Sequence, residues 1–166
     1  GVAGTSMRML AGECGLNVAT LYHHFPSKAD LLRAVLSERG YVQRLDQEGP
    51  PDELLRGAAD ERLGRFVRWL WLASLEEESV WRLLVGESLR GDASARVEAT
   101  ALVGAIDHVL PDWLARVVPE LSDRTVAVAR LVRAQLFSLV VEHLALGPDD
   151  DRARERVRAL VEAIDP

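Results

Sequence analysis

The segment from Thr5 to Lys28, TSMRMLAGECGLNVATLYHHFPSK, constrains the fold more than any other part of the chain. Ala11 supplies the small side chain at which two helices can cross closely. Gly15, four residues later, can take the positive φ that a sharp turn needs, and Leu21 can anchor a second helix to a shared core. The spacing predicts two short helices joined by a tight turn, which is the helix–turn–helix arrangement.

Capping residues set the limits of these two helices. Thr5 and Ser6 can cap the first, which should run to about Cys14, and we expect the Cys14 side chain to be a buried small apolar group. Asn17 can cap the second helix, which is expected over residues 18–25.

The segments before and after these two helices can also be predicted. Pro26 should end the second helix, because the residue before a proline avoids the helical region. Ser27 can then cap a third helix that runs to about Arg44. Gly1 and its neighbours look like the end of an earlier element, so we expect a helix to precede Gly1.

The composition favours an all-α fold. Ala, Leu, Val, Arg and Glu are abundant, while Ile, Thr and Tyr, which favour strands, are scarce. No apolar run is long enough to span a bilayer, and no secretory signal is visible. The chain has a single cysteine, which fits a reducing compartment. We therefore expect a cytoplasmic protein that makes no membrane contact.

Charge is distributed unevenly along the chain. The first 45 residues carry five Lys or Arg against three Asp or Glu, a net charge of +2, whereas the remainder carries 15 against 23, a net charge of −8. A mildly basic end on an acidic body suits a protein that touches phosphates with one end only.

The sequence Glu48–Gly49–Pro50–Pro51 marks the clearest break, because two prolines end a helix and stiffen a link. We place a domain boundary there, between a domain of residues 1–45 and one of residues 46–166. Asp52 is expected to cap a long helix with one apolar stripe. The stripe consists of Leu55, Ala59, Leu63, Phe66, Leu70 and Ala73.

Punctuating residues divide the remainder of the second domain. The acidic run 76–78 interrupts the long helix, and Gly91 closes a shorter one. Asp92 or Ser94 opens another, which Pro111 should break or kink.

The last two helices are expected over residues 123–146 and 152–164. Ser122 should cap the first of them, and Gly147 with Pro148 should stop it. Together the two helices present more apolar area than one bundle needs.

The stretch LNVATLYHHFPSKADLL resembles the recognition segment of the TetR family of bacterial repressors. In that family a glycine turn precedes a short helix ending in Leu-Tyr-x-His-Phe, followed by a small polar residue, Lys and a Leu pair. The matching residues here are Gly15, Leu21, Tyr22, His24, Phe25, Ser27, Lys28, Leu31 and Leu32. The resemblance covers about residues 1–45, and beyond them only the number and length of helices agree. One departure is Val18–Ala19, where many relatives have a small or basic residue followed by Gly.

The resemblance implies which residues contact DNA. Backbone phosphates would be bound by Thr5, Ser6, Tyr22, His24 and Lys28. The base edges would face Asn17, Ala19, Thr20 and His23, and Val18 is a further candidate DNA-binding residue. Among these, Asn can pair with adenine and Ala or a Thr methyl can touch the thymine methyl, while Val offers no hydrogen bond.

Other interpretations of the same residues remain. Outside the motif, Tyr22 on a small amphipathic helix would be a packing residue. His23 and His24 could suggest a metal, but neighbouring helix positions point about 100° apart, and no second ligand pair lies nearby. We expect neither a metal nor a cofactor.

The second domain offers candidates for a small-molecule pocket. Polar groups on apolar helices need partners, and a few such anchors in an apolar cavity are typical of ligand sites. The candidate ligand-binding residues are Trp69, Trp81, His108, Gln135 and Glu142. An alternative is that the polar stripe of Gln135, Ser138 and Glu142 pairs within itself or across a dimer. At most one of Trp69 and Trp71 is expected to face inward.

The resemblance implies a ligand-responsive transcriptional repressor that a small molecule releases from a palindromic operator in double-stranded DNA. A twofold homodimer through residues 123–146 and 152–164 would place two recognition helices on that palindrome. No enzyme is expected, since paired carboxylates, a nucleophile–base pair and a glycine-rich phosphate loop are not found. The alternative is a helical protein-interaction module with a vestigial DNA-binding head.

Overall fold

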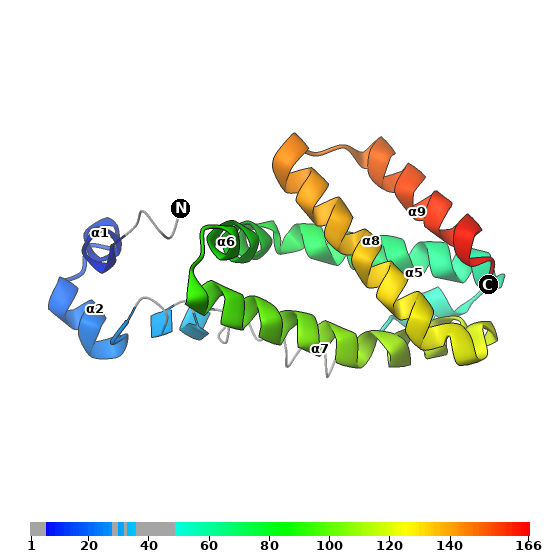
Figure 1. Ribbon diagram of the computed structural model, residues 1–166, viewed down its shortest axis with the longest axis horizontal. Coiled ribbons are helices and arrows are strands. Elements are labelled where there is room, and N and C mark those ends of the chain that lie inside the picture. Colours follow the sequence, from blue (N-terminus) through cyan, green and yellow to red (C-terminus); the bar gives the residue numbers. More distant parts are fainter. Residues whose placement is uncertain (1–5, 28–29, 32, 36–48) are drawn as a thin grey trace. The chain divides into compact units, whose positions relative to one another are not determined.

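Helices provide the regular structure of the computed structural model, which describes residues 6–27, 30–31, 33–35 and 49–166 (Figure 1). No strand occurs among these residues, so the predicted all-α fold is confirmed. The α-helices are α1 (Met7–Glu13), α2 (Val18–His24), α5 (Ala59–Glu76), α6 (Glu78–Leu89), α7 (Ala93–Val117), α8 (Thr125–Leu146) and α9 (Asp150–Ile164). Two 3-10 helices, η2 (Asp52–Leu55) and η3 (Pro119–Arg124), lie between them.

The chain forms two compact units, and each is built from segments far apart in the sequence. The first unit comprises residues 1–44 and 79–104, and the second comprises residues 45–78 and 105–166. The helix α7 therefore begins in one unit and ends in the other. The domain boundary near residue 46 stays a prediction. The division into compact units groups residues 79–104 with the N-terminal residues 1–44.

The second unit is held together by an apolar core. Its most deeply buried side chains include Leu63, Phe66 and Val67 of α5, as the predicted stripe requires for the first two. The helix α5 packs against both α8 and α9, and α8 packs against α9. Figure 1 shows α8 and α9 as an antiparallel pair, as expected for helices joined by a short loop.

Arg62 fastens one end of this unit. Its Nε donates a 2.7 Å hydrogen bond to the carbonyl oxygen of Val117, the last residue of α7. A second 2.7 Å bond reaches the carbonyl of Gly57, and the guanidinium also pairs with Glu120. The hydrogen bond from Arg62 is the main reason that the pKa of the Glu120 carboxyl is lowered. The carbonyl of the buried Val117, at the end of α7, thereby gains a partner.

Two expected helix starts are wrong. Asp52 does not cap a long helix but begins η2, and Gly57, with φ of +96°, separates η2 from α5. Ser122 does not cap α8, because it lies inside η3 at φ of 51°. Instead the helix starts at Thr125, whose Oγ1 donates a 2.8 Å hydrogen bond to the Ser122 carbonyl.

Of the two expected effects of Pro111, the break does not occur, since α7 continues through it, and the kink stays a prediction. Proline removes one backbone hydrogen bond from a helix and crowds the preceding turn. Around Pro111, however, Leu110 and Leu114 are buried in the core of the second unit. Their burial offsets the lost hydrogen bond.

None of the helices described is long and apolar enough to cross a bilayer.

Candidate nucleic-acid interface

A helix–turn–helix occupies the start of the described chain. Ser6 caps α1 by accepting a 3.2 Å hydrogen bond from the backbone N–H of Met9. The helix ends in a turn at Gly15, whose φ is +64°. There the N–H of Leu16 bonds to the carbonyl of Ala11 at 2.8 Å, and that of Gly15 bonds to Gly12 at 3.1 Å. These two bonds form a Schellman motif, which the glycine permits because it has no Cβ.

The two short helices share a small core of their own. Met7, Ala11 and Leu21 are its buried members, and Ala11 is only 2% exposed. The partly buried side chains packed on them are Leu10, Val18, Phe25 and Leu31. The predicted crossing at Ala11 and anchoring by Leu21 are both confirmed. Val18 lies against this core, so less of its side chain remains for DNA than the resemblance implies.

The opposite face of α2 is exposed. Its exposed side chains are those of Ala19, Thr20, Tyr22, His23 and His24. Tyr22 is 51% exposed although it is a large aromatic residue, so the packing interpretation of this side chain is not supported. The His23 and His24 rings meet edge to face with centroids 5.4 Å apart. The structure therefore presents a contiguous polar and aromatic surface on one helix.

Asn17 caps α2, and this structural role limits how the same side chain can contact a base. Its Oδ1 accepts a 2.8 Å hydrogen bond from the backbone N–H of Ala19 and so caps α2. Bidentate pairing with adenine needs both the amide oxygen and the amide nitrogen. While the cap is in place, one lone pair of the oxygen is occupied, whereas the amide nitrogen has no partner among the described residues.

The segment after α2 begins as expected. Phe25 is extended, with φ of −131°, as a residue before proline should be. Ser27 caps the following turn: its Oγ accepts a 3.1 Å bond from the Asp30 N–H and donates a 2.6 Å bond to the Asp30 carboxylate. Arg33, one turn further, pairs with Asp30 and with Glu98 of α7.

Two predicted DNA-contacting residues, Thr5 and Lys28, lie outside the described residues, as does Leu32 of the family pattern. The expectation for Cys14 is wrong. Cys14 follows the last residue of α1 and is exposed, because the helix ends before its side chain can turn inward.

The candidate ligand-binding residues are spread over four helices. Trp69 is half-buried and stacks on Phe66 with ring centroids 6.0 Å apart, while Trp81 is half-buried on α6. His108 is exposed on α7. The Nε2 of Gln135 is buried without a hydrogen-bond partner.

Part of the polar stripe on α8 pairs within the chain. The Oγ of Ser138 donates a 3.2 Å bond to Glu142, which also accepts a 2.9 Å bond from Arg156. For Glu142 the structure therefore shows the alternative of internal pairing. Trp71 is buried, whereas Trp69 is half-buried and packs against the main apolar core of the second unit, of which Trp71 is not a member.

Glu87 is a buried charge that the sequence interpretation missed. Its side chain is 1% exposed, with one carboxylate oxygen 2.7 Å from Arg90 and the other without a partner. The signal was present in the spacing, because Val80, Leu84 and Glu87 follow one another at helical steps of four and three.

No group of three or more His, Cys, Asp or Glu able to hold a metal ion occurs in the described part of the chain. Residues 1–35, about a fifth of the chain, match the family model described as bacterial regulatory proteins, TetR family. A comparison with curated proteins gives no significant match. The matched segment contains the capped helices, the Gly15 turn and the exposed face of α2. This N-terminal module is therefore the DNA-binding module of the TetR family of bacterial transcriptional regulators.

Proposed function

We propose that the chain is a homodimeric, ligand-responsive repressor that a small molecule releases from its operator. The observation that carries the proposal is the anchoring of α2: Leu21 holds one face in the core while Tyr22 and its neighbours stand exposed on the other. A helix held in this way is available to the major groove of DNA.

Different residues are assigned to contacts with the DNA backbone, which position the protein, and to contacts with the bases, which read the sequence. Ser6, Tyr22 and His24 contact phosphates, together with Thr5 and Lys28. Ala19, Thr20 and His23 face the base edges, with the free amide nitrogen of Asn17. Because this set has few hydrogen-bonding readers, part of the specificity comes from DNA shape.

The proposed dimer forms through residues 123–146 and 152–164. Large apolar side chains are exposed along α8, and they are Val126, Leu131, Phe137, Val141 and Leu146. Exposed apolar residues in this number on one helix favour burial against a partner. A symmetric pair of α8 and α9 helices would bury them and set two recognition helices on a palindrome.

The proposed effector lies near the apolar core of the second unit. The buried Nε2 of Gln135 has no acceptor, and a ligand carbonyl or carboxylate would supply one. Trp69 offers an aromatic surface close to that core. Binding would shift the population of conformations away from the DNA-bound form. The protein acts in the cytoplasm, where operator DNA is accessible.

The alternative function, an interaction module with a vestigial head, is separated from the first by DNA binding. Binding of the full chain to the DNA upstream of its own gene would be measured by fluorescence anisotropy at several salt concentrations. The affinity should fall steeply with salt, and Lys28→Ala should reduce the slope by about one. Tyr22→Ala should weaken binding, while Lys28→Arg should retain it. Binding that shows no sequence preference would favour the alternative.

A further inference from the structure

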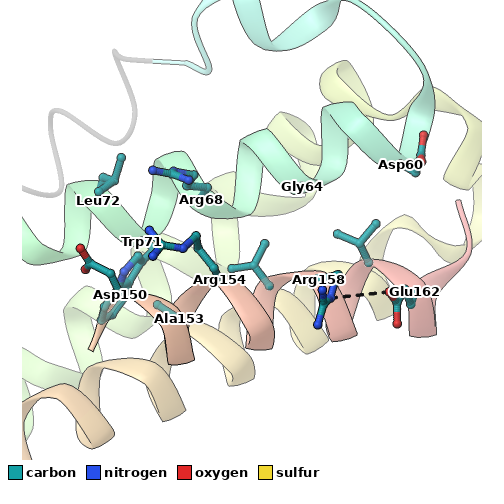
Figure 2. A pocket seen from close by; sticks show the side chains of 12 residues that line it. Asp60, Gly64, Arg68, Trp71, Leu72, Asp150, Ala153, Arg154, Arg158 and Glu162 are labelled. Atoms are coloured by element: carbon teal, nitrogen blue, oxygen red, sulfur yellow. Dashed lines mark ion pairs between the residues drawn. The ribbon is translucent and has the colours of Figure 1, made fainter. Parts of the chain in front are cut away.

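A groove runs between α5 and α9 within the second unit (Figure 2). Its volume is about 430 Å³, in the range of small-molecule sites. Figure 2 shows Arg68, Trp71, Leu72, Asp150 and Arg154 at one end of it, and Val157 also lines the groove. This groove is distinct from the surroundings of Gln135 considered above.

Arg68 gives this end of the groove an uncommitted positive charge. It is exposed on α5 and forms no ion pair or hydrogen bond within the described part of the chain. Arg154 reaches from α9 toward Trp71, as Figure 2 shows, and pairs with Asp151, whose side chain is 92% exposed. A guanidinium binds carboxylate or sulfonate oxygens through paired N–H groups. Arg68 and Arg154 thus line the same groove, and together they form the cradle proposed below for one anionic group.

The wall beside this cradle is apolar. Leu72 is 47% exposed, and Val157 also lines the groove. Trp71 is buried at its base, and its ring meets that of His143 edge to face with centroids 5.8 Å apart. His143 in turn lies 3.3 Å from the Glu78 carboxylate. Trp71 is thus held in place before any ligand binds, which lowers the entropic cost of binding.

We propose that this groove binds an organic monoanion with a flat apolar body. The anionic group lies between Arg68 and Arg154, and the body lies along Trp71 and Leu72. Asp150, which lines the same groove, repels negative charge and opposes a dianion more strongly than a monoanion. The inference does not depend on the chain being a repressor.

The test uses the full chain without DNA and isothermal titration calorimetry with 2-naphthoate as the probe. The neutral analogue 2-naphthamide has the same body without the charge. We expect saturable binding of 2-naphthoate and at least about tenfold weaker binding of the amide, the loss that one charge-assisted hydrogen bond represents. Equal affinity for the two compounds, or no saturable binding of 2-naphthoate, would overturn the proposal.

Matched variants locate the site. Arg68→Gln should weaken binding of 2-naphthoate by about tenfold or more, whereas Arg130→Gln, which removes the same charge from an exposed position on α8, should not. Leu72→Glu should abolish binding by placing a negative charge in the groove. Ala73→Glu, the next residue and exposed outside the groove, should leave it intact. Binding unchanged in Arg68→Gln or in Leu72→Glu would contradict the assignment. Because no DNA is present, either result leaves the repressor proposal to its own test.

Discussion

The Nε of Arg33 lies 3.2 Å from Oε1 of Glu98, so the segment that follows α2 is joined to the first half of α7. Both residues belong to the first compact unit, and α7 continues from there into the second. The pair therefore connects the chain just after α2 with a helix that contributes residues to both units.

The Arg33–Glu98 pair should contribute little to stability, because the Arg33 side chain is 60% exposed. We expect a double-mutant cycle of Arg33→Gln and Glu98→Gln to give a coupling energy of about 0.2–1 kcal/mol. Urea unfolding of the four proteins at low and high salt measures it, and the coupling should shrink with salt. A coupling above about 2 kcal/mol would show that the pair is part of a larger network.

The turn at Gly15 should be sensitive to a side chain for conformational reasons alone. A Cβ at this glycine would meet nothing within 4 Å, but its φ of +64° disfavours any L residue. Gly15→Ala should destabilise α1 and α2 by about 1–2 kcal/mol, measured as faster hydrogen exchange of their amides.

Gly12 provides the matched control for Gly15. It lies inside α1, and a Cβ there would also meet nothing within 4 Å. Gly12→Ala should therefore slow exchange, with a gain of about 0.5–1 kcal/mol. If both variants changed the exchange rates in the same direction, the conformational explanation would be wrong.

The two roles of Asn17 can be separated by substitution. Asn17→Ala removes the cap on α2 and should cost about 0.5–2 kcal/mol of helix stability. Asn17→Ser restores a capping oxygen but carries no amide nitrogen. Measured against a set of operator variants, Asn17→Ser should keep the helix and lose discrimination at the base that the nitrogen contacts. Unchanged discrimination would leave Asn17 with its capping role alone.

Asp149 should make the stability of α9 depend on acid. Its carboxylate accepts a 2.9 Å hydrogen bond from the backbone N–H of Arg152, the largest of the effects that lower its pKa. A carboxyl whose pKa is lower in the folded state stabilises the fold above its unfolded pKa. This stability is lost as pH falls through the folded value. The melting temperature should therefore begin to drop below pH about 4. In Asp149→Asn, which keeps a capping oxygen without the charge, this part of the pH dependence should disappear.

Much of the structure of the helix–turn–helix segment could be predicted, because it depends on interactions between residues close in sequence. The caps at Ser6, Asn17 and Ser27 each satisfy a backbone N–H two or three residues away, so their sequence neighbours decide them. The turn at Gly15 and the core contacts of Leu21 follow from spacing in the same way. The match of residues 1–35 to the family model agrees with this part of the interpretation.

Features that depend on contacts between distant parts of the chain were harder to predict from the sequence. Asp52 and Ser122 are good capping residue types, yet neither caps a helix, because the turns at Gly57 and in η3 set the later starts. The groove was not visible in the sequence at all. It exists because α5 packs on α9, and no motif marks Arg68 or Trp71 as neighbours of the last helix.

The exposed thiol of Cys14 makes the head directly observable. Cys14 is the only cysteine in the chain and sits beside the Gly15 turn, outside the core of the two short helices. A maleimide-linked spin label would therefore attach once per protomer without any engineered substitution. In a twofold assembly, pulsed electron paramagnetic resonance spectroscopy would then report the distance between the two labels in the presence and absence of operator or effector.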